Sequence, residues 1–72
     1  MTRKEYRHRL ADFYEALDDF KNELEEVRFK IMMENKPERK AWFIAAQERL
    51  LHEKDATEER LKQFISKNGS VF

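Results

Sequence analysis

The sequence contains no cysteine, and its 72 residues include only one glycine and one proline. Without cysteine the chain can form neither a disulfide nor a thiolate ligand, so a reducing compartment suits it. So little glycine and proline argues against a fold of strands and turns and is typical of long helices. No apolar run approaches the ~18 residues of a membrane span, and no signal-peptide core follows the start. We therefore expect a cytoplasmic protein without a membrane partner.

Charge is abundant but balanced. Asp, Glu, Lys and Arg make up 42% of the residues, and the formal net charge is zero. The charge is nevertheless banded: residues 1–9 carry +3, residues 12–26 carry −6 and residues 28–40 carry +3. A zero total argues against a dedicated nucleic-acid-binding protein, whose affinity comes largely from neutralising phosphates. With 40% apolar residues the chain is also unlike a disordered acidic tail.

The first half of the chain repeats a large apolar residue every third or fourth position. These residues follow alternating spacings of four and three, which predicts one long helix with a heptad seam. Thr2 and Glu5 form a capping-box pattern at its start, in which each side chain bonds the other residue's free backbone amide. We expect this helix over about residues 2–34. The seam residues are Tyr6, Leu10, Phe13, Leu17, Phe20, Leu24, Val27 and Ile31.

Pro37 predicts a turn at residues 35–36 and a second helix over about residues 37–67. A residue before proline avoids helical dihedrals, and proline itself fits the first turn of a helix. Because the turn is short, the second helix should run antiparallel to the first. Gly69 is expected to end this helix in the left-handed conformation, followed by a tail within residues 68–72.

The second helix has a less regular apolar pattern. Three neighbouring rows of residues seven apart share its apolar side chains, and Ala56 is the only apolar residue between Leu51 and Leu61. In a hairpin, Ala56 and Thr57 would leave room for the rings of the first helix, and Lys54 could lay its methylenes on the seam. The rows are Phe43, Leu50, Thr57 and Phe64; Ile44, Leu51, Glu58 and Ile65; and Gln47, Lys54 and Leu61.

Two helices alone cannot cover nine aromatic side chains. A hairpin buries one stripe of each helix, and the conformational entropy lost in so small a chain nearly cancels that gain. We therefore expect an all-α fold, an antiparallel two-helix hairpin that dimerises into a four-helix bundle. The second copy would supply the apolar surface that the middle of the second helix lacks.

Apolar residues gather around the turn on positions that face away from the seam. Phe29 points almost directly away from it, Met32 and Met33 lie on its outer flanks, and Trp42 belongs to a stretch that is apolar all round. Basic residues, among them Arg39 and Lys40, surround this patch. Methionine and tryptophan are common at the centres of protein interfaces, so the patch is a candidate docking surface. The alternative is that Trp42 folds over Met33 and Phe29 and forms a local core, or that the patch is the dimer contact.

Signals of catalysis are weak. Glu48 and His52 are one helical turn apart, but no second histidine follows at metalloprotease spacing. The acidic pairs within residues 15–26 lie mostly on outer faces and lack facing carboxylates for Mg²⁺. We expect no catalytic residue, no metal and no cofactor.

The sequence thus favours a small non-catalytic protein–protein interaction module, a regulator, inhibitor or adaptor. Its expected partners are a second copy of itself and another protein. The expected contact residues are Phe29, Met32, Met33, Arg39, Lys40 and Trp42. The alternative is a nucleic-acid-binding helical dimer that uses the basic bands, including the start of the chain.

Overall fold

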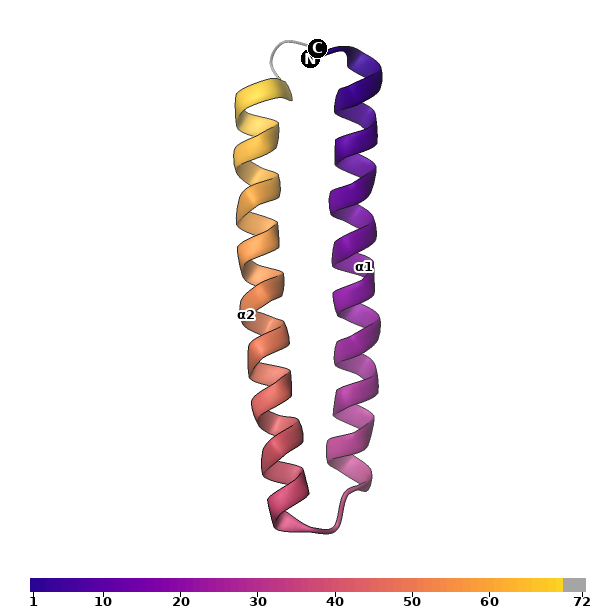
Figure 1. The fold of residues 1–72 in the computed structure, drawn as a ribbon, viewed down its shortest axis with the longest axis vertical. Helices are drawn as coiled ribbons and strands as arrows, with labels where there is room; N and C mark the ends of the chain where they lie inside the picture. Colours follow the sequence, from indigo (N-terminus) through magenta and orange to yellow (C-terminus); the bar gives the residue numbers. More distant parts are fainter. Residues whose placement is uncertain (70–72) are drawn as a thin grey trace.

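The computed structural model describes residues 1–69 and contains two helices, α1 (Arg3–Met33) and α2 (Pro37–Asn68). They run antiparallel, side by side along their whole length, and form a flat rod of 53 × 16 × 11 Å (Figure 1). The prediction of an all-helical hairpin is confirmed. Residues 70–72 of the expected tail lie outside the described residues.

Half of the predicted capping box forms at the start of α1. Thr2 is extended, with φ −80° and ψ 161°, and its Oγ1 accepts a hydrogen bond of 3.1 Å from the backbone N–H of Glu5. Within residues 1–69 the reciprocal bond, from the Thr2 amide to the Glu5 carboxylate, is not formed. Thr2 therefore satisfies one of the free amides of the first turn by itself.

The connection between the helices is extended, as the proline requires. Lys36 has φ −86° and ψ 122°, and Pro37 begins α2. No side chain caps the start of α2; instead the Lys36 amide donates a 3.2 Å bond to the Glu34 carboxylate. The chain reverses direction within residues 34–36.

The expectation that Gly69 adopts a left-handed conformation is wrong. Its φ is −65° and its ψ −32°, which is right-handed, and its N–H still donates to the Ile65 carbonyl. A Cβ at Gly69 would lie 3.2 Å from the Tyr6 hydroxyl oxygen and 3.4 Å from Ile65. A side chain at this position would have to displace the end of the Tyr6 side chain by a few tenths of an ångström, and a positive φ is not involved.

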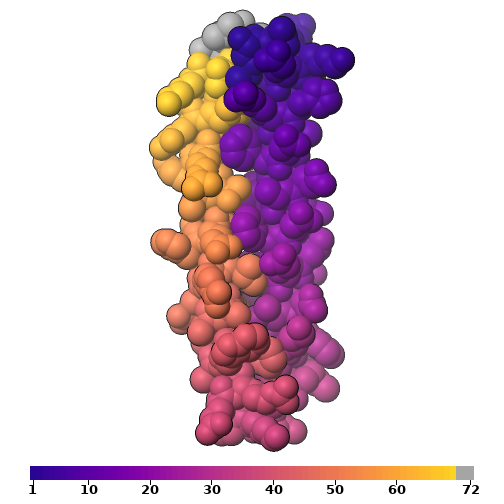
Figure 2. Space-filling model, in the orientation of Figure 1, coloured from indigo at the N-terminus to yellow at the C-terminus, as the bar shows by residue number. Residues whose placement is uncertain are grey.

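The seam of α1 faces α2 as predicted, and the matching seam of α2 is half polar. Only Leu24, 5% exposed, and Leu61, 8% exposed, are buried among the described residues; the other seam residues are half-buried. Figure 2 shows the side chains of the two helices in contact along the rod. The seam of α2 consists of Phe43, Gln47, Leu50, Lys54, Thr57, Leu61, Phe64 and Asn68.

The middle of α2 fills the seam differently from the prediction. Ala56 is exposed, because it lies between seam positions 54 and 57 on the outward turn of the helix, so it leaves no room for rings. Thr57 does face α1, and its hydroxyl donates 2.9 Å to the Glu53 carbonyl. Lys54 is half-buried in the seam, and its ammonium lies 2.9 Å from the Glu58 carboxylate. Polar side chains thus occupy positions that the first helix fills with leucine and phenylalanine.

Candidate functional site

The end of the hairpin near the turn carries a group of exposed apolar side chains, which we call the tip. Its members are Phe29 (58% exposed), Met32 (72%), Met33 (62%) and Trp42 (67%). Phe29 and the two methionines come from the last turns of α1, and Trp42 from the second turn of α2. All four side chains point away from the seam, because their positions lie outside the buried stripe of the helix to which each belongs.

Trp42 does not fold over Met33 and Phe29 in this structure. Its ring lies against the neighbouring Phe43, with ring centroids 5.3 Å apart and an interplanar angle of 68°. Phe43 is also approached by the Lys30 ammonium, 5.9 Å from the ring centroid, so its ring is shared between the seam and the rim of the tip. The tip is therefore not a local core of the single chain.

Basic side chains surround the tip. Lys30 forms an ion pair of 3.4 Å with Glu26, one turn earlier on the same helix. Arg39 and Lys40, in the first turn of α2, are exposed and form no ion pair with any residue in the range 1–69. The positive charges of Arg39 and Lys40 are consequently available to an acidic group outside the chain.

A second apolar surface lies along one broad side of the rod, and sequence reasoning did not identify it as a site. We call it the Leu51 face; its large apolar members are Tyr14 (56% exposed), Ile44 (40%), Leu51 (36%) and Ile65 (40%). The spacing of seven between positions 44, 51, 58 and 65 was the available signal, although position 58 is a glutamate and that row was expected to form part of the stripe facing the first helix. In the structure α2 is rotated so that this row points to the side.

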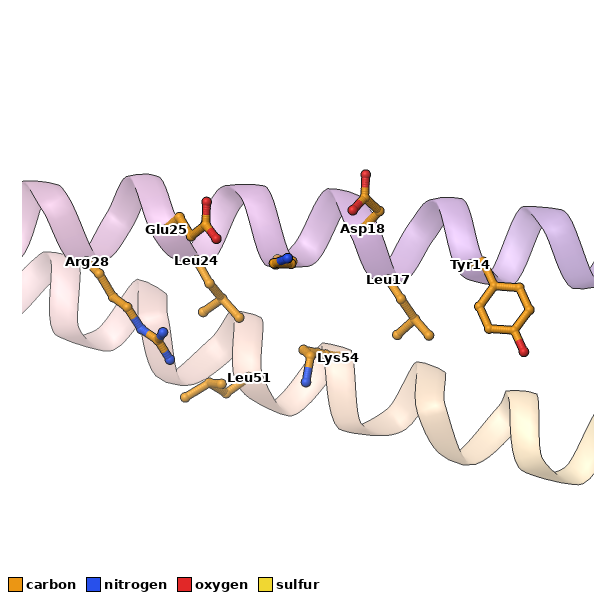
Figure 3. A pocket seen from close by; sticks show the side chains of 9 residues that line it. Tyr14, Leu17, Asp18, Leu24, Glu25, Arg28, Leu51 and Lys54 are labelled. Carbon is orange, nitrogen blue, oxygen red and sulfur yellow. The ribbon is translucent and has the colours of Figure 1, made fainter.

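The centre of the Leu51 face is a shallow groove between the helices. Leu17 and Leu24 of α1 point towards α2 there, and Leu51 and Lys54 face them from α2 (Figure 3). Tyr14 borders the groove on the α1 side, as do the charged residues Asp18, Lys21, Glu25 and Arg28. An apolar floor between long charged side chains is suited to covering by another helix.

The other candidate sites noted in the sequence do not bring together side chains that could bind a metal in the described part of the chain. Within residues 1–69 no three side chains of His, Cys, Asp or Glu come together as a metal site, and the Glu48–His52 pair gains no third ligand. Arg3, Lys4, Arg7 and His8 surround a hollow at the N-terminal end, while Tyr6 stacks on Phe64 in the seam. Neither α1 nor α2 is apolar enough over a sufficient length to cross a membrane.

No protein-family model, curated protein or solved structure is significantly similar to this chain. The functional argument therefore depends on the two surfaces themselves.

Proposed function

We propose that this chain is a small non-catalytic protein–protein interaction module, a regulator, inhibitor or adaptor, that binds another protein through the tip. The observation that supports it most directly is the 58–72% exposure of four large apolar side chains gathered at one end of the rod. Such side chains contribute little to the stability of the hairpin when they remain in water, whereas burying one in an interface is worth about 1.5–3 kcal/mol. An exposed apolar group of this kind, rimmed by charge, is the usual mark of an interaction site.

The chemistry of the tip defines the partner it fits. Unbranched methionine side chains adapt to irregular surfaces, and the Trp42 indole combines a large apolar area with one hydrogen-bond donor. The unpaired cations of Arg39 and Lys40 favour acidic groups around the binding pocket and speed the encounter with them. The partner is thus a protein with an apolar pocket and an acidic rim.

The chain also acts as a self-associating hairpin in this proposal. Among residues 1–69 only two side chains, both leucines, are buried to more than nine-tenths, and the apolar side chains of the Leu51 face remain 36–56% exposed. A 72-residue hairpin with so small a core is marginal on its own, and association is the common remedy. A homodimer and a tip-binding partner are compatible, because the tip and the Leu51 face lie on different parts of the rod.

Site-specific cross-linking tests the tip. A photoreactive amino acid replaces Met32 in one sample and Glu59, on an outer face of α2, in the matched control. We expect a partner that cross-links from position 32 and not from position 59. The purified partner should then bind Met33→Ser about tenfold or more weakly than wild type. Ala11→Ser, at an exposed position towards the opposite end of the rod, should bind like wild type.

Two results would contradict docking at the tip. If position 32 cross-links only a second copy of the chain, the tip is a dimer contact. If the purified partner binds Met33→Ser and wild type equally, it uses another surface.

A further inference from the structure

We propose that a second copy of the chain packs on the Leu51 face, with the tips of both copies at the same end of the resulting four-helix bundle. The inference rests on the self-association proposed above and adds the surface and the orientation. It is independent of what binds the tip.

The two broad sides of the rod differ in a way that identifies the contact surface. Apart from Met1 and the tip, every exposed large apolar side chain among residues 1–69 belongs to the Leu51 face. The flanking positions of the opposite broad side contain only small or charged residues, namely Arg9, Ala16, Glu23, Lys30, Ala46, Glu53, Arg60 and Lys67. The broad side with small and charged residues is suited to contact with water, and the Leu51 face is suited to contact with a partner.

The rotation of α2 accounts for this difference. The row of Ile44, Leu51, Glu58 and Ile65 contains three aliphatic residues, whereas the row of Gln47, Lys54, Leu61 and Asn68 contains only one. It is nevertheless the second, more polar row that faces α1. This rotation directs polar residues towards α1 and aliphatic residues towards one broad side of the rod. It is explained if that broad side is also an interface. Polar residues in a heptad seam cost stability and select one register and one oligomeric state.

The size of the face matches a dimer contact. The broad side spans 53 × 16 Å between Cα atoms, which is comparable with the ~800 Å² that each partner contributes to a standard protein interface. A second hairpin has the same length and the same flat side, so it can cover the face from end to end. A short peptide would cover only the central groove.

The charges along the face make it self-complementary in one orientation. Its α1 edge consists of Arg7, Tyr14, Lys21 and Arg28, and its α2 edge of Ile65, Glu58, Leu51 and Ile44, each written from the chain ends towards the turn. A two-fold axis parallel to the rod places the α1 edge of one copy against the α2 edge of the other. Three basic side chains then lie over aliphatic ones, and Tyr14 lies opposite Glu58 of the second copy.

In this orientation the basic heads also find acidic partners. Ile44 and Leu51, which lie opposite Arg28 and Lys21 of the second copy, are followed one helical turn later by Glu48 and Asp55 on the outer flank of α2. The methylene stems of Lys21 and Arg28 can therefore cover aliphatic side chains while their charges reach these carboxylates. The arrangement buries the apolar row without leaving a charge unpaired at its centre.

The opposite orientation, with the tips at opposite ends, is disfavoured by like charges. Arg7 and Arg28 lie at nearly equal distances from the middle of α1. A two-fold axis across the rod would therefore place Arg7 of one copy against Arg28 of the other. Such like-charge contacts cost affinity and commonly exclude a competing arrangement.

Solution molar mass tests the surface. We expect wild type at twice its 8.9 kDa chain mass. Leu51→Glu, on the face, should be monomeric at the same concentration, its dissociation constant raised about tenfold or more. Ala56→Glu, which introduces the same charge at an exposed position away from the face, should remain dimeric. Tyr14→Glu, on the other helix of the face, gives a second monomeric variant if Leu51→Glu does not fold, with helix content measured by circular dichroism.

The outcomes separate the claims. A wild-type chain that stays at 8.9 kDa at every concentration overturns self-association and this inference together, and leaves docking at the tip untouched. A wild-type dimer that persists in both Leu51→Glu and Tyr14→Glu overturns the surface alone.

Orientation is tested with a spin label on Asn35→Cys, which is specific because the chain has no other cysteine. With the tips together, the distance between the two labels should be well below half of the 53 Å rod length. A distance close to the full length would overturn the proposed orientation.

Discussion

The Tyr6 ring stacks on the Phe64 ring, with centroids 5.3 Å apart and an interplanar angle of 16°. The same Phe64 ring meets Phe13 at 5.5 Å, tilted by 44°. Helical side chains lean towards the N-terminus of their own helix, which brings the Phe13 ring towards Phe64. These three rings connect the first turns of α1 to the last turns of α2 at the end of the rod opposite the turn.

Removing the shared ring should therefore open that end of the hairpin. We expect Phe64→Ala to lower the free energy of unfolding by about 2 kcal/mol, less than the 3–5 kcal/mol of a fully buried phenylalanine because this one is half-buried. Phe64→Leu is the control and should lose only a fraction of that. Denaturant unfolding at one fixed protein concentration measures the difference. Equal losses for the two variants would show that ring contacts do not stabilise this end.

The tip and the core should respond in opposite ways to truncation. Leu24→Ala removes one of the two buried side chains and should cost about 2–5 kcal/mol. Phe29→Ala and Met33→Ala remove exposed side chains and should change stability by no more than about 0.5 kcal/mol. Thermal unfolding of the three variants is the measurement. A drop of several degrees for Phe29→Ala and Met33→Ala would mean that the tip is packed in solution.

The capping hydrogen bond of Thr2 is a local contribution that can be measured alone. Thr2→Ala should destabilise the start of α1 by about 1 kcal/mol, since the Glu5 amide loses its 3.1 Å acceptor. Thr2→Ser keeps a hydroxyl and should behave like wild type. Hydrogen exchange of the first-turn amides reports the change directly. Faster exchange in Thr2→Ser as well would assign the effect to the lost methyl group.

Local signals explain how much of this fold is predictable from the sequence. The seam of α1 is a regular heptad, and Pro37 dictates an extended residue before it, so the helices and the turn follow from neighbouring residues. The rotation of α2 about its axis does not follow from neighbouring residues. Which of its three adjacent rows faces α1 is decided only by the side chains that each row would contact on α1. Phe64 meets Tyr6 and Phe13, and this fixes the row that contains it against α1.

The two surfaces differ in predictability for the same reason. Phe29, Met32, Met33 and Trp42 lie outside the heptad seam, so the sequence singles them out as a group. Their exposure is known only from the structure, because the sequence also allowed Trp42 to fold over Met33 and Phe29. The Leu51 face becomes visible only when the rotation of α2 is known. Gly69 likewise departs from the expectation, because its N–H continues the helical hydrogen bonding of α2 to the Ile65 carbonyl.

Nucleic-acid binding through the basic bands should be absent. The basic residues near the start adjoin a band of −6 over residues 12–26, and Tyr6 is stacked in the seam. We expect no gel shift of duplex DNA or hairpin RNA at low salt, where phosphate contacts are strongest. Retardation that weakens with added salt and disappears in Arg3→Gln/Arg7→Gln would contradict this expectation and favour the basic end as a binding site.

Lys54 places a cation in the seam where the other helix has leucines, and it should limit stability. It lines the groove with Leu17 and Leu24, and its ammonium pairs with Glu58 at 2.9 Å. The Glu58 side chain is 41% exposed, so water can solvate its carboxylate when Lys54 is removed and little is lost with the ion pair. A leucine at position 54 would instead bury additional apolar surface against Leu17 and Leu24. We therefore expect Lys54→Leu to raise the free energy of unfolding by about 1 kcal/mol, measured by denaturant titration.

The same substitution should loosen the choice of assembly. A polar seam residue disfavours every register that encloses it completely, because its charge would then be removed from water, and a leucine imposes no such penalty. Lys54→Leu should thus give a mixture of molar masses in place of a single one. Glu59→Leu, at an exposed position on the outer face of α2, is the control for added hydrophobicity and should keep the wild-type mass. If Lys54→Leu is more stable and still has one sharply defined mass, the seam lysine does not specify the oligomer, and the selection depends on the charges that border the Leu51 face.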